Sequence, residues 1–432
     1  MASSITRLSS IKMSLRRLSW KTQPSQKTSE EVVKPCGGES IRYLLPVELW
    51  LRIFEILACD PESMDTNGHN PFFASQSCQE RRVQNILALP IIKVCQHWRM
   101  LATPMLYQYI VVKDESCLDL LLRTFVDCQR RTCLHVNTYV HRLAVSVQLY
   151  TSDNADKLSR VLSLLPNLQI MSFPGSISRK WKGLLSPVIL TALSACHESI
   201  QVLDFSDSAT APHPFDLRRL LSNTPHLRAL TLTRESPRDR EDAVVPYLRP
   251  LILPELYFLS MRYQSSFPLV PGDQFSSLRC FEFKLGHNSD FSLWRRRLSQ
   301  YGNHVTAVAV HTGPYRVDMQ AVVDMLRDTC PHLTHLSIGP GARWNLPQGL
   351  RLPCITHFAV LRGGAAGAHA FFQNLLTIQA PDLQMLRLSS AMALQLALWP
   401  ELYDQIDSRP FQVQDEFGWP LTSTTLLYRT YG

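Results

Sequence analysis

The chain has 432 residues, of which 45% are hydrophobic, 9% aromatic and 19% charged, so it can bury one large core or several small ones. This composition excludes a disordered polymer. The eleven cysteines form no C-x-x-C pair and their number is odd, which predicts free thiols in a reducing compartment, the cytoplasm or the nucleus. No apolar run reaches the roughly 18 to 20 residues of a membrane-spanning helix, and no secretory signal is recognisable near Met1.

The formal net charge of +8 is concentrated at the start of the chain. Residues 1–29 hold six basic residues and no acidic one, so the rest of the chain is nearly neutral. This distribution favours a disordered basic leader over residues 1–40 and argues against a nucleic-acid or membrane partner for the folded part. A mitochondrial transit peptide is the alternative, because apolar residues between Ile5 and Trp20 recur at helical spacing among the basic ones.

Residues 41–112 are predicted to form a small helical module. Residues 44–57 have apolar side chains at helical spacing, and Pro46 suits the first turn of a helix. A second apolar stripe, in residues 91–102, is expected to end or bend at Pro104. Between the two helices, turn-forming residues predict an inserted loop over residues 59–90.

The order of residues in this module resembles the F-box motif. The sequence reads Leu45-Pro46-x-Glu48-Leu49, then Ile53-Phe54 and Leu57, then Val94-Cys95-x-x-Trp98-Arg99-x-Leu101-Ala102, and finally Pro104-x-Leu106-Tyr107. In that family the module binds a Skp-type linker protein, which connects it to a cullin-RING assembly. The inserted loop is longer than the connection usual in the family.

By this resemblance, ten apolar residues are candidates for binding the linker: Leu45, Pro46, Leu49, Ile53, Phe54, Leu57, Val94, Trp98, Leu101 and Leu106. Each of them can either insert into the linker or build the core of the module. The sequence alone does not separate these two roles.

A second pattern, L-x-x-L-x-L, recurs ten times at steps of 22 to 32 residues, with a mean of 27. The copies begin at Val140, Leu168, Ile200, Leu227, Leu256, Leu278, Val305, Leu333, Ile355 and Leu383. Helical spacing lies between several copies, at residues 156–165, 188–196, 216–221, 320–328 and 371–378. The period predicts an α/β fold of short parallel strands alternating with helices, stacked as a solenoid over residues 113–390, with a C-terminal cap or tail over residues 391–432.

This repeat resembles the irregular leucine-rich repeats that often follow an F-box, as in F-box proteins of the fungal type. A doubly wound α/β enzyme also alternates strands with helices. Against that alternative, the strands are short and the chain has neither a G-x-x-x-x-G-K-[ST] loop nor a G-x-G-x-x-G loop. The glycine-rich segment Gly363–Gly367 lacks the lysine of a phosphate-binding loop and is expected to be a flexible loop.

Strand alternation places the residues at +2, +4 and +6 of each copy on the face opposite the core. That face is expected to carry Arg142, Ile170, Asp204, Phe258 and Met385, together with the candidate substrate-binding residues Arg262, Glu282, Lys284, His311, His335, His357 and Arg387. His335 and His357 occupy equivalent positions in neighbouring copies and are expected to stack if their strands are adjacent. They could then make binding pH-sensitive or support a metal, or simply be a solvated pair.

No catalytic residue, metal site or cofactor is predicted. The group Cys128, Cys133, His135 and His141 has the wrong spacing for a zinc finger. The resemblance implies a non-catalytic substrate-recognition adaptor of a Skp-cullin-F-box (SCF) ubiquitin ligase, which directs an unknown target protein to degradation. The alternatives are a leucine-rich-repeat scaffold that acts independently of a ligase, and an enzyme with an unrecognised α/β site.

Overall fold

The computed structural model describes residues 45–58, 90–130, 135–146, 151–173, 183–205, 210–232, 249–261, 270, 272–285, 291–312, 317–339, 346–360, 368–416 and 418–422. The chain divides into two units, residues 1–46 and 47–432, and the description below concerns the second unit except where Leu45 and Pro46 are named. The predicted leader, the inserted loop apart from Pro90, Arg262, Cys133 and the segment Gly363–Gly367 lie outside the described residues.

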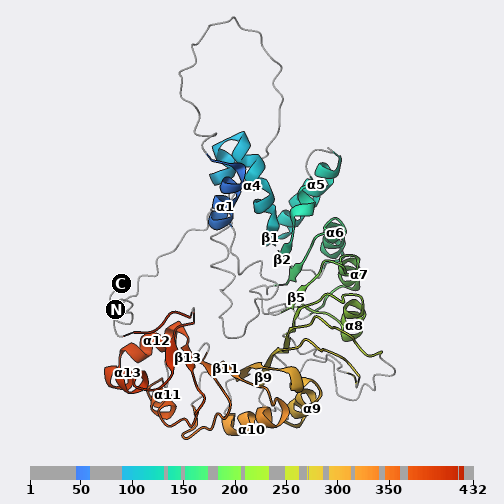
Figure 1. The fold of residues 1–432 in the computed structure, drawn as a ribbon. Coiled ribbons are helices and arrows are strands. Elements are labelled where there is room, and N and C mark those ends of the chain that lie inside the picture. The colour runs from blue at the N-terminus through green and yellow to red at the C-terminus, as the bar shows by residue number, and fades with distance from the viewer. Residues whose placement is uncertain are drawn as a thin grey trace, which may run out of the picture. The chain divides into compact units, whose positions relative to one another are not determined.

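Helices alternate with short strands along most of the chain (Figure 1). The α-helices are α1 (Val47–Ala58), α4 (Gln96–Gln108), α5 (Glu115–Arg130), α6 (Ser152–Leu162), α7 (Pro187–Ala195), α8 (Pro214–Ser222), α9 (Phe291–Tyr301), α10 (Met319–Thr329), α11 (Ala368–Leu375), α12 (Ser390–Ala397) and α13 (Pro400–Asp407). Residues 90–94 are also helical.

The main sheet contains twelve strands: β1 (Tyr109–Val112), β2 (Arg142–Val145), β3 (Ile170–Ser172), β5 (Val202–Phe205), β7 (Ala229–Leu232), β8 (Phe258–Met261), β9 (Cys280–Leu285), β10 (Ala307–Thr312), β11 (His335–Gly339), β12 (His357–Val360), β13 (Met385–Leu388) and β14 (Gln412–Gln414). A separate two-stranded sheet joins β4 (Gly183–Leu184) to β6 (Thr210–Ala211).

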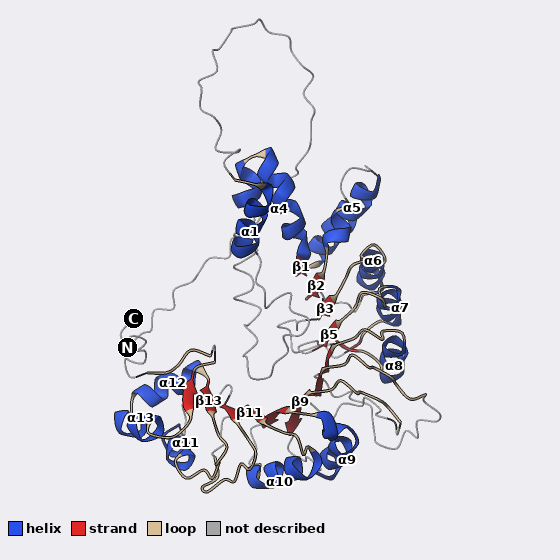
Figure 2. Ribbon diagram, viewed as in Figure 1, coloured by secondary structure: helices blue, strands red, loops and turns tan. Residues whose placement is uncertain are grey.

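The twelve strands are parallel and follow one another across the sheet in chain order. A doubly wound sheet reverses its strand order at a switch point, so the consecutive order contradicts the doubly wound alternative. The structure is an α/β fold whose arrangement is compatible with a solenoid. Figure 2 shows the helices α6 to α13 along one side of the strands.

The strands pair in one continuous register, which places equivalent side chains in rows across the sheet. The second residue of each strand is apolar and faces the helices: Ile110, Leu143, Met171, Leu203, Leu230, Leu259, Phe281, Val308, Leu336, Phe358, Leu386 and Val413. From Leu143 onward these side chains are buried in one continuous core with the inner faces of the helices. Burying each one contributes about 1.5–3 kcal/mol.

Local signals fix where several helices begin. The Thr151 hydroxyl accepts a hydrogen bond from the Asn154 amide at the start of α6, and the Asp318 carboxylate accepts from the amides of Gln320 and Ala321 at the start of α10. Such N-caps satisfy amides that have no partner inside the helix. Proline occupies the first position of α7 and α8, where a missing N–H costs nothing.

The predicted repeat is confirmed strand by strand, because each of the ten L-x-x-L-x-L copies contains a strand, from β2 to β13. The five predicted helical segments overlap α6, α7, α8, α10 and α11, with bounds that differ by one to four residues. Of the two outcomes expected at Pro104, an end or a bend of the helix, the end was wrong, since α4 continues through it to Gln108. The helical residues 90–94 are instead interrupted at Cys95, whose sulfur caps α4 by accepting from the Trp98 amide.

The sheet also extends beyond the predicted repeat at both ends. Strand β1 directly follows α4, and β14 lies in the predicted cap. After β14 the chain turns back, and the Leu421 amide donates to the Val413 carbonyl on the side of β14 that faces away from β13. A bridge between Gln414 and Pro420 completes this antiparallel return.

The connections around β8 contain no helix among their described residues, and a buried ion pair holds them instead. The Arg218 guanidinium of α8 donates two hydrogen bonds to the Asp273 carboxylate, at 2.6 and 3.1 Å. Asp273 also accepts from the amides of Leu251 and Val270. One carboxylate therefore fastens the segments before β8 and β9 to helix α8.

We expect Arg218→Met to destabilise this part of the sheet strongly. Removing one partner of a buried pair leaves an uncompensated charge, at a cost of about 3–5 kcal/mol. Urea unfolding followed by circular dichroism would measure the loss. Arg219→Met changes the exposed neighbour on the same helix and serves as the control. Equal stability of the two variants would contradict the role assigned to the pair.

Candidate functional site

Helices α1 and α4 enclose a small aromatic core. The ring of Phe54 is fully buried, and the ring of Trp98 lies 5.1 Å from it and 4.7 Å from that of Trp50. Ile91 and Met105 are buried in the same cluster. Each aromatic pair adds about 0.5–1.5 kcal/mol beyond the area it buries. Phe54 and Trp98 therefore contribute to the core of the module.

A different set of apolar side chains on the same helices points into solvent. Leu49 is 49% exposed and Ile56 is 70% exposed, and the half-buried Ile53 lies between them at helical spacing. Val94 and Met100 are both 59% exposed. We call Leu49, Ile53 and Ile56 the α1 stripe. Leu49 and Ile56 are exposed, whereas Ile53 also packs against the Phe54 cluster, so the structure distinguishes core side chains from exposed ones on α1.

The remaining linker-binding candidates differ in exposure. Leu45, Leu101 and Leu106 are half-buried, Pro46 is exposed, and the side chain of Leu57 lies outside the described residues. Ile56 and Met100 were not among the predicted candidates. Ile56 follows Leu49 by seven residues, and this spacing alone would have placed the two on one face.

The second candidate surface is the strand face, which carries the first, third and fifth residues of each strand. It lies opposite the leucine rows and has two parts. From β3 to β10 the first row is apolar and buried, with exposures of 1–6%: Ile170, Val202, Ala229, Phe258, Cys280 and Ala307. From β9 to β13 the face carries the polar candidates of the sequence prediction. The apolar part has little side-chain surface to offer a partner.

An acid–imidazole pair lies within the polar part. The Nε2 atom of His311 is 2.6 Å from the Glu282 carboxylate, on neighbouring strands β10 and β9. Gly339 of β11 makes room for the ring, since a Cβ at this position would overlap Nδ1 of His311. Lys284 lies beside His311 in the fifth row and is half-buried.

His335 and His357 stack as the sequence predicted. Their strands are adjacent, and their ring centroids lie 4.1 Å apart with the planes inclined by 9°. Each Nδ1 atom lies 2.8 Å from the hydroxyl of the preceding threonine, Thr334 or Thr356. Each hydroxyl also lies within hydrogen-bond reach of the carbonyl of the residue just before the preceding strand, Thr306 or Thr334. These contacts hold both rings parallel.

The surroundings of the pair disfavour a pH switch, and its stacked geometry disfavours a metal site. Burial and the neighbouring His357 lower the pKa of His335 to about 4, and burial and Arg387 lower that of His357. His335 therefore stays neutral between pH 5.5 and 7.5, outside the range of a physiological switch. The lone pairs of parallel rings point side by side rather than at one shared point, so the two rings do not converge on a metal.

The other charged candidates are anchored within the fold. The Arg387 guanidinium donates to the Gln414 side chain at 2.9 Å, with buried Asp415 close enough to favour its charge. The guanidinium of Arg142, in β2, lies 4.8 Å above the ring of Tyr109, a cation–π contact. Asp204, in the third row of β5, is half-buried.

Three buried cysteines are poor candidates for nucleophiles. Burial raises the pKa of the Cys196, Cys280 and Cys330 thiols to about 11, so these are not ready nucleophiles. All seven cysteines in the described ranges are free. Within the same ranges no three metal-binding side chains gather, and no helix is long and apolar enough to cross a bilayer.

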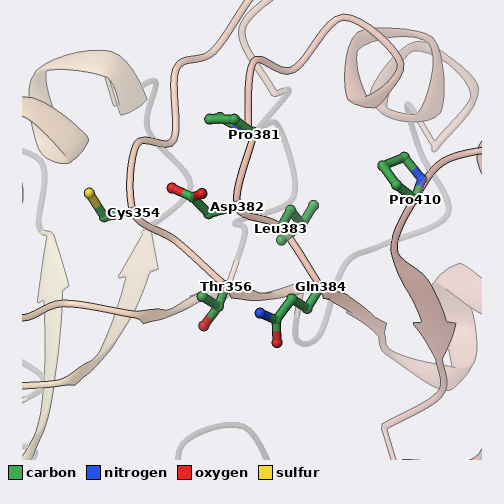
Figure 3. Close-up of a pocket in the computed structure, with 7 residues that line it drawn as sticks. All are labelled: Cys354, Thr356, Pro381, Asp382, Leu383, Gln384 and Pro410. Atoms are coloured by element: carbon green, nitrogen blue, oxygen red, sulfur yellow. The ribbon is translucent and has the colours of Figure 1, made fainter.

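A pocket of about 570 Å³ opens where the chain enters the last three strands (Figure 3). Its lining residues are Cys354, Thr356, Pro381, Asp382, Leu383, Gln384 and Pro410. Cys354 is exposed and has a left-handed backbone, with φ of 64°. This pocket was not predicted from the sequence, because three segments about 27 residues apart form it.

Comparison with known proteins adds no family to this picture. No protein-family model matches the sequence, and a search of curated proteins finds no significant match.

The His335 environment predicts a pH dependence of stability. A histidine in an unfolded chain titrates near pH 6.5, so between pH 6.5 and 4 the unfolded state binds more protons than the folded one. The contribution of His335 to the free energy of unfolding is therefore fully present above pH 6.5 and is lost as the pH falls towards 4. We expect His335→Gln to flatten this dependence in urea unfolding, and the exposed control His332→Gln to leave it unchanged. A profile that His335→Gln does not alter would contradict the assignment.

Proposed function

We propose that the chain is a non-catalytic adaptor of an SCF-type ubiquitin ligase. In this proposal the helices α1 and α4 form an F-box-like module that binds a Skp-type linker, and the sheet with its helices is a leucine-rich-repeat solenoid that binds a target protein. Ubiquitin transfer would follow from proximity, since the adaptor only holds the target near the rest of the assembly.

The observation that carries the proposal is that α1 has both a buried apolar side and exposed apolar side chains. Phe54 is buried against Trp98, whereas Leu49 and Ile56 are exposed on the other side of the same helix. A short helix pair that fills its own core and still presents an apolar stripe has the properties of a helix face that docks in a partner's groove. The order of the motif residues supports a Skp-type linker as that partner.

The architecture beyond the module supports a target-binding role. Strand β1 begins at Tyr109, directly after α4 ends at Gln108, so no linker separates the two parts in the chain. The strand face presents the polar side chains of β9 to β13 over several strands. Repeat proteins commonly bind partners through such extended faces.

A repeat scaffold that acts outside any ligase is the second candidate. The polar strand face would serve both functions equally well, so it does not discriminate between them. The α1 stripe does, because a scaffold without a ligase has no need of exposed apolar side chains on α1.

We expect the double variant Leu49→Asp, Ile56→Asp to lose co-purification with a Skp-type linker protein. A true interface anchor is worth about 2 kcal/mol or more, so affinity should fall by at least about 30-fold. Both side chains are exposed, and the fold should survive, as circular dichroism would verify.

The matched control is Leu120→Asp, Val188→Asp, which changes two exposed apolar residues on α5 and α7. This control should bind like the wild type. Phe54→Ala should instead unfold the module, at a cost of about 3–5 kcal/mol. A folded wild-type chain that does not bind the linker would rule out the adaptor and leave the scaffold.

A further inference from the structure

The pocket at the start of the last three strands has an apolar floor and a polar rim. Leu383 is buried, whereas Asp382, Gln384 and Pro410 are exposed, as is the thiol-bearing residue Cys354. In Figure 3 the Asp382 carboxylate lies on the side of the pocket nearest Cys354. The volume of about 570 Å³ lies within the range that holds a ligand or several atoms of a peptide.

The charge of this pocket is uncompensated. Asp382 is the only charged residue in its lining, and within the described ranges it forms no ion pair. Arg409, next to the lining residue Pro410, donates its guanidinium to the Leu376 carbonyl at 2.5 Å, and Arg387 of β13, which follows Asp382 in the chain, donates to the Gln414 side chain. His357, which shares a hydrogen bond with the lining residue Thr356, has a lowered pKa and brings no positive charge.

The chemistry of the lining selects a cationic side chain with an aliphatic stem. A carboxylate accepts strong, charge-assisted hydrogen bonds from a guanidinium or ammonium group, and the Gln384 amide offers a further oxygen acceptor. Leu383 and the two proline rings supply apolar surface, against which the methylene groups of arginine or lysine pack favourably. An anionic ligand would meet the Asp382 charge with nothing to offset it.

We propose that this pocket binds an arginine side chain of an extended protein segment, with lysine as a weaker substitute. Arginine fits better because its planar fork can donate two parallel hydrogen bonds to one carboxylate. As a contact for a ligase target the site rests on the proposed adaptor function, whereas the binding itself does not depend on it. The site lies away from the α1 stripe in the chain and uses none of its residues.

Cys354 provides a built-in reporter for occupancy. It is exposed, free and part of the lining, so a side chain in the pocket should shield it from alkylation. The full-length protein is treated with iodoacetamide, and the modification rate at Cys354 is measured by peptide mass spectrometry. The probes are three acetylated, amidated peptides, Gly-Ser-X-Ser-Gly with X as arginine, lysine or glutamine, and binding of fluorescent forms is measured by anisotropy.

We expect the arginine peptide to slow alkylation of Cys354 in a saturable manner, the lysine peptide to do so at higher concentration, and the glutamine peptide to have no effect. Asp382→Asn should weaken the arginine peptide about tenfold or more, because a hydrogen bond to a charged group is lost. The control Asp404→Asn, an exposed carboxylate on α13, should bind like the wild type.

Equal protection by the arginine and glutamine peptides, or unchanged protection in Asp382→Asn, would overturn the proposal. So would the absence of both protection and anisotropy change with the arginine peptide. Linker co-purification is measured separately and should be the same for wild type and Asp382→Asn. Linker co-purification without binding of the arginine peptide would overturn the pocket proposal alone. Peptide binding without linker co-purification would overturn the adaptor proposal alone.

Discussion

The structure depends on one constraint: no repeat can bury its own leucines. Each strand of the main sheet has only three to six residues, and its apolar second residue becomes inaccessible only when the neighbouring strands and a covering helix are in place. Continuous parallel register follows from this requirement, since a slip of one residue would turn a leucine row towards the strand face. The same register brings residues from distant parts of the chain into rows, and the stacked pair His335 and His357 is one result.

The two candidate surfaces solve different problems with different chemistry. The α1 stripe is a narrow apolar face on a short helix, where one or two anchors can dominate binding. The strand face is broad, and its charged groups are already engaged by neighbours, as Arg387 is by Gln414. Engaged charges hold a fixed geometry, so they favour selective contacts over strong ones. Under the proposed adaptor function, the α1 stripe would bind one constant partner and the strand face a selected one.

Much of the fold could be predicted from the sequence because leucine periodicity directly reflects the stacking constraint. Prediction failed where another interaction replaced the leucine pattern. Strand β14 was missed because Asp415 occupies the position where the L-x-x-L-x-L pattern places its last apolar residue, and Pro104 was misjudged because the packing of α4 outweighs one lost hydrogen bond. The site was less predictable. Only coordinates separate the buried Phe54 from the exposed Leu49, and only they bring Cys354, Asp382 and Pro410 around one pocket.

The antiparallel return after β14 has a consequence for how copies of this chain can meet. A parallel stack that ended at β14 would offer its outward amides and carbonyls to a strand of the next molecule, and head-to-tail addition of that kind produces fibres. The Leu421 amide occupies the Val413 carbonyl, and the bridge from Gln414 to Pro420 runs opposite to the direction that another repeat would need. The return thus engages part of the outward edge of β14 within the same chain, which disfavours the addition of a further parallel strand at that edge.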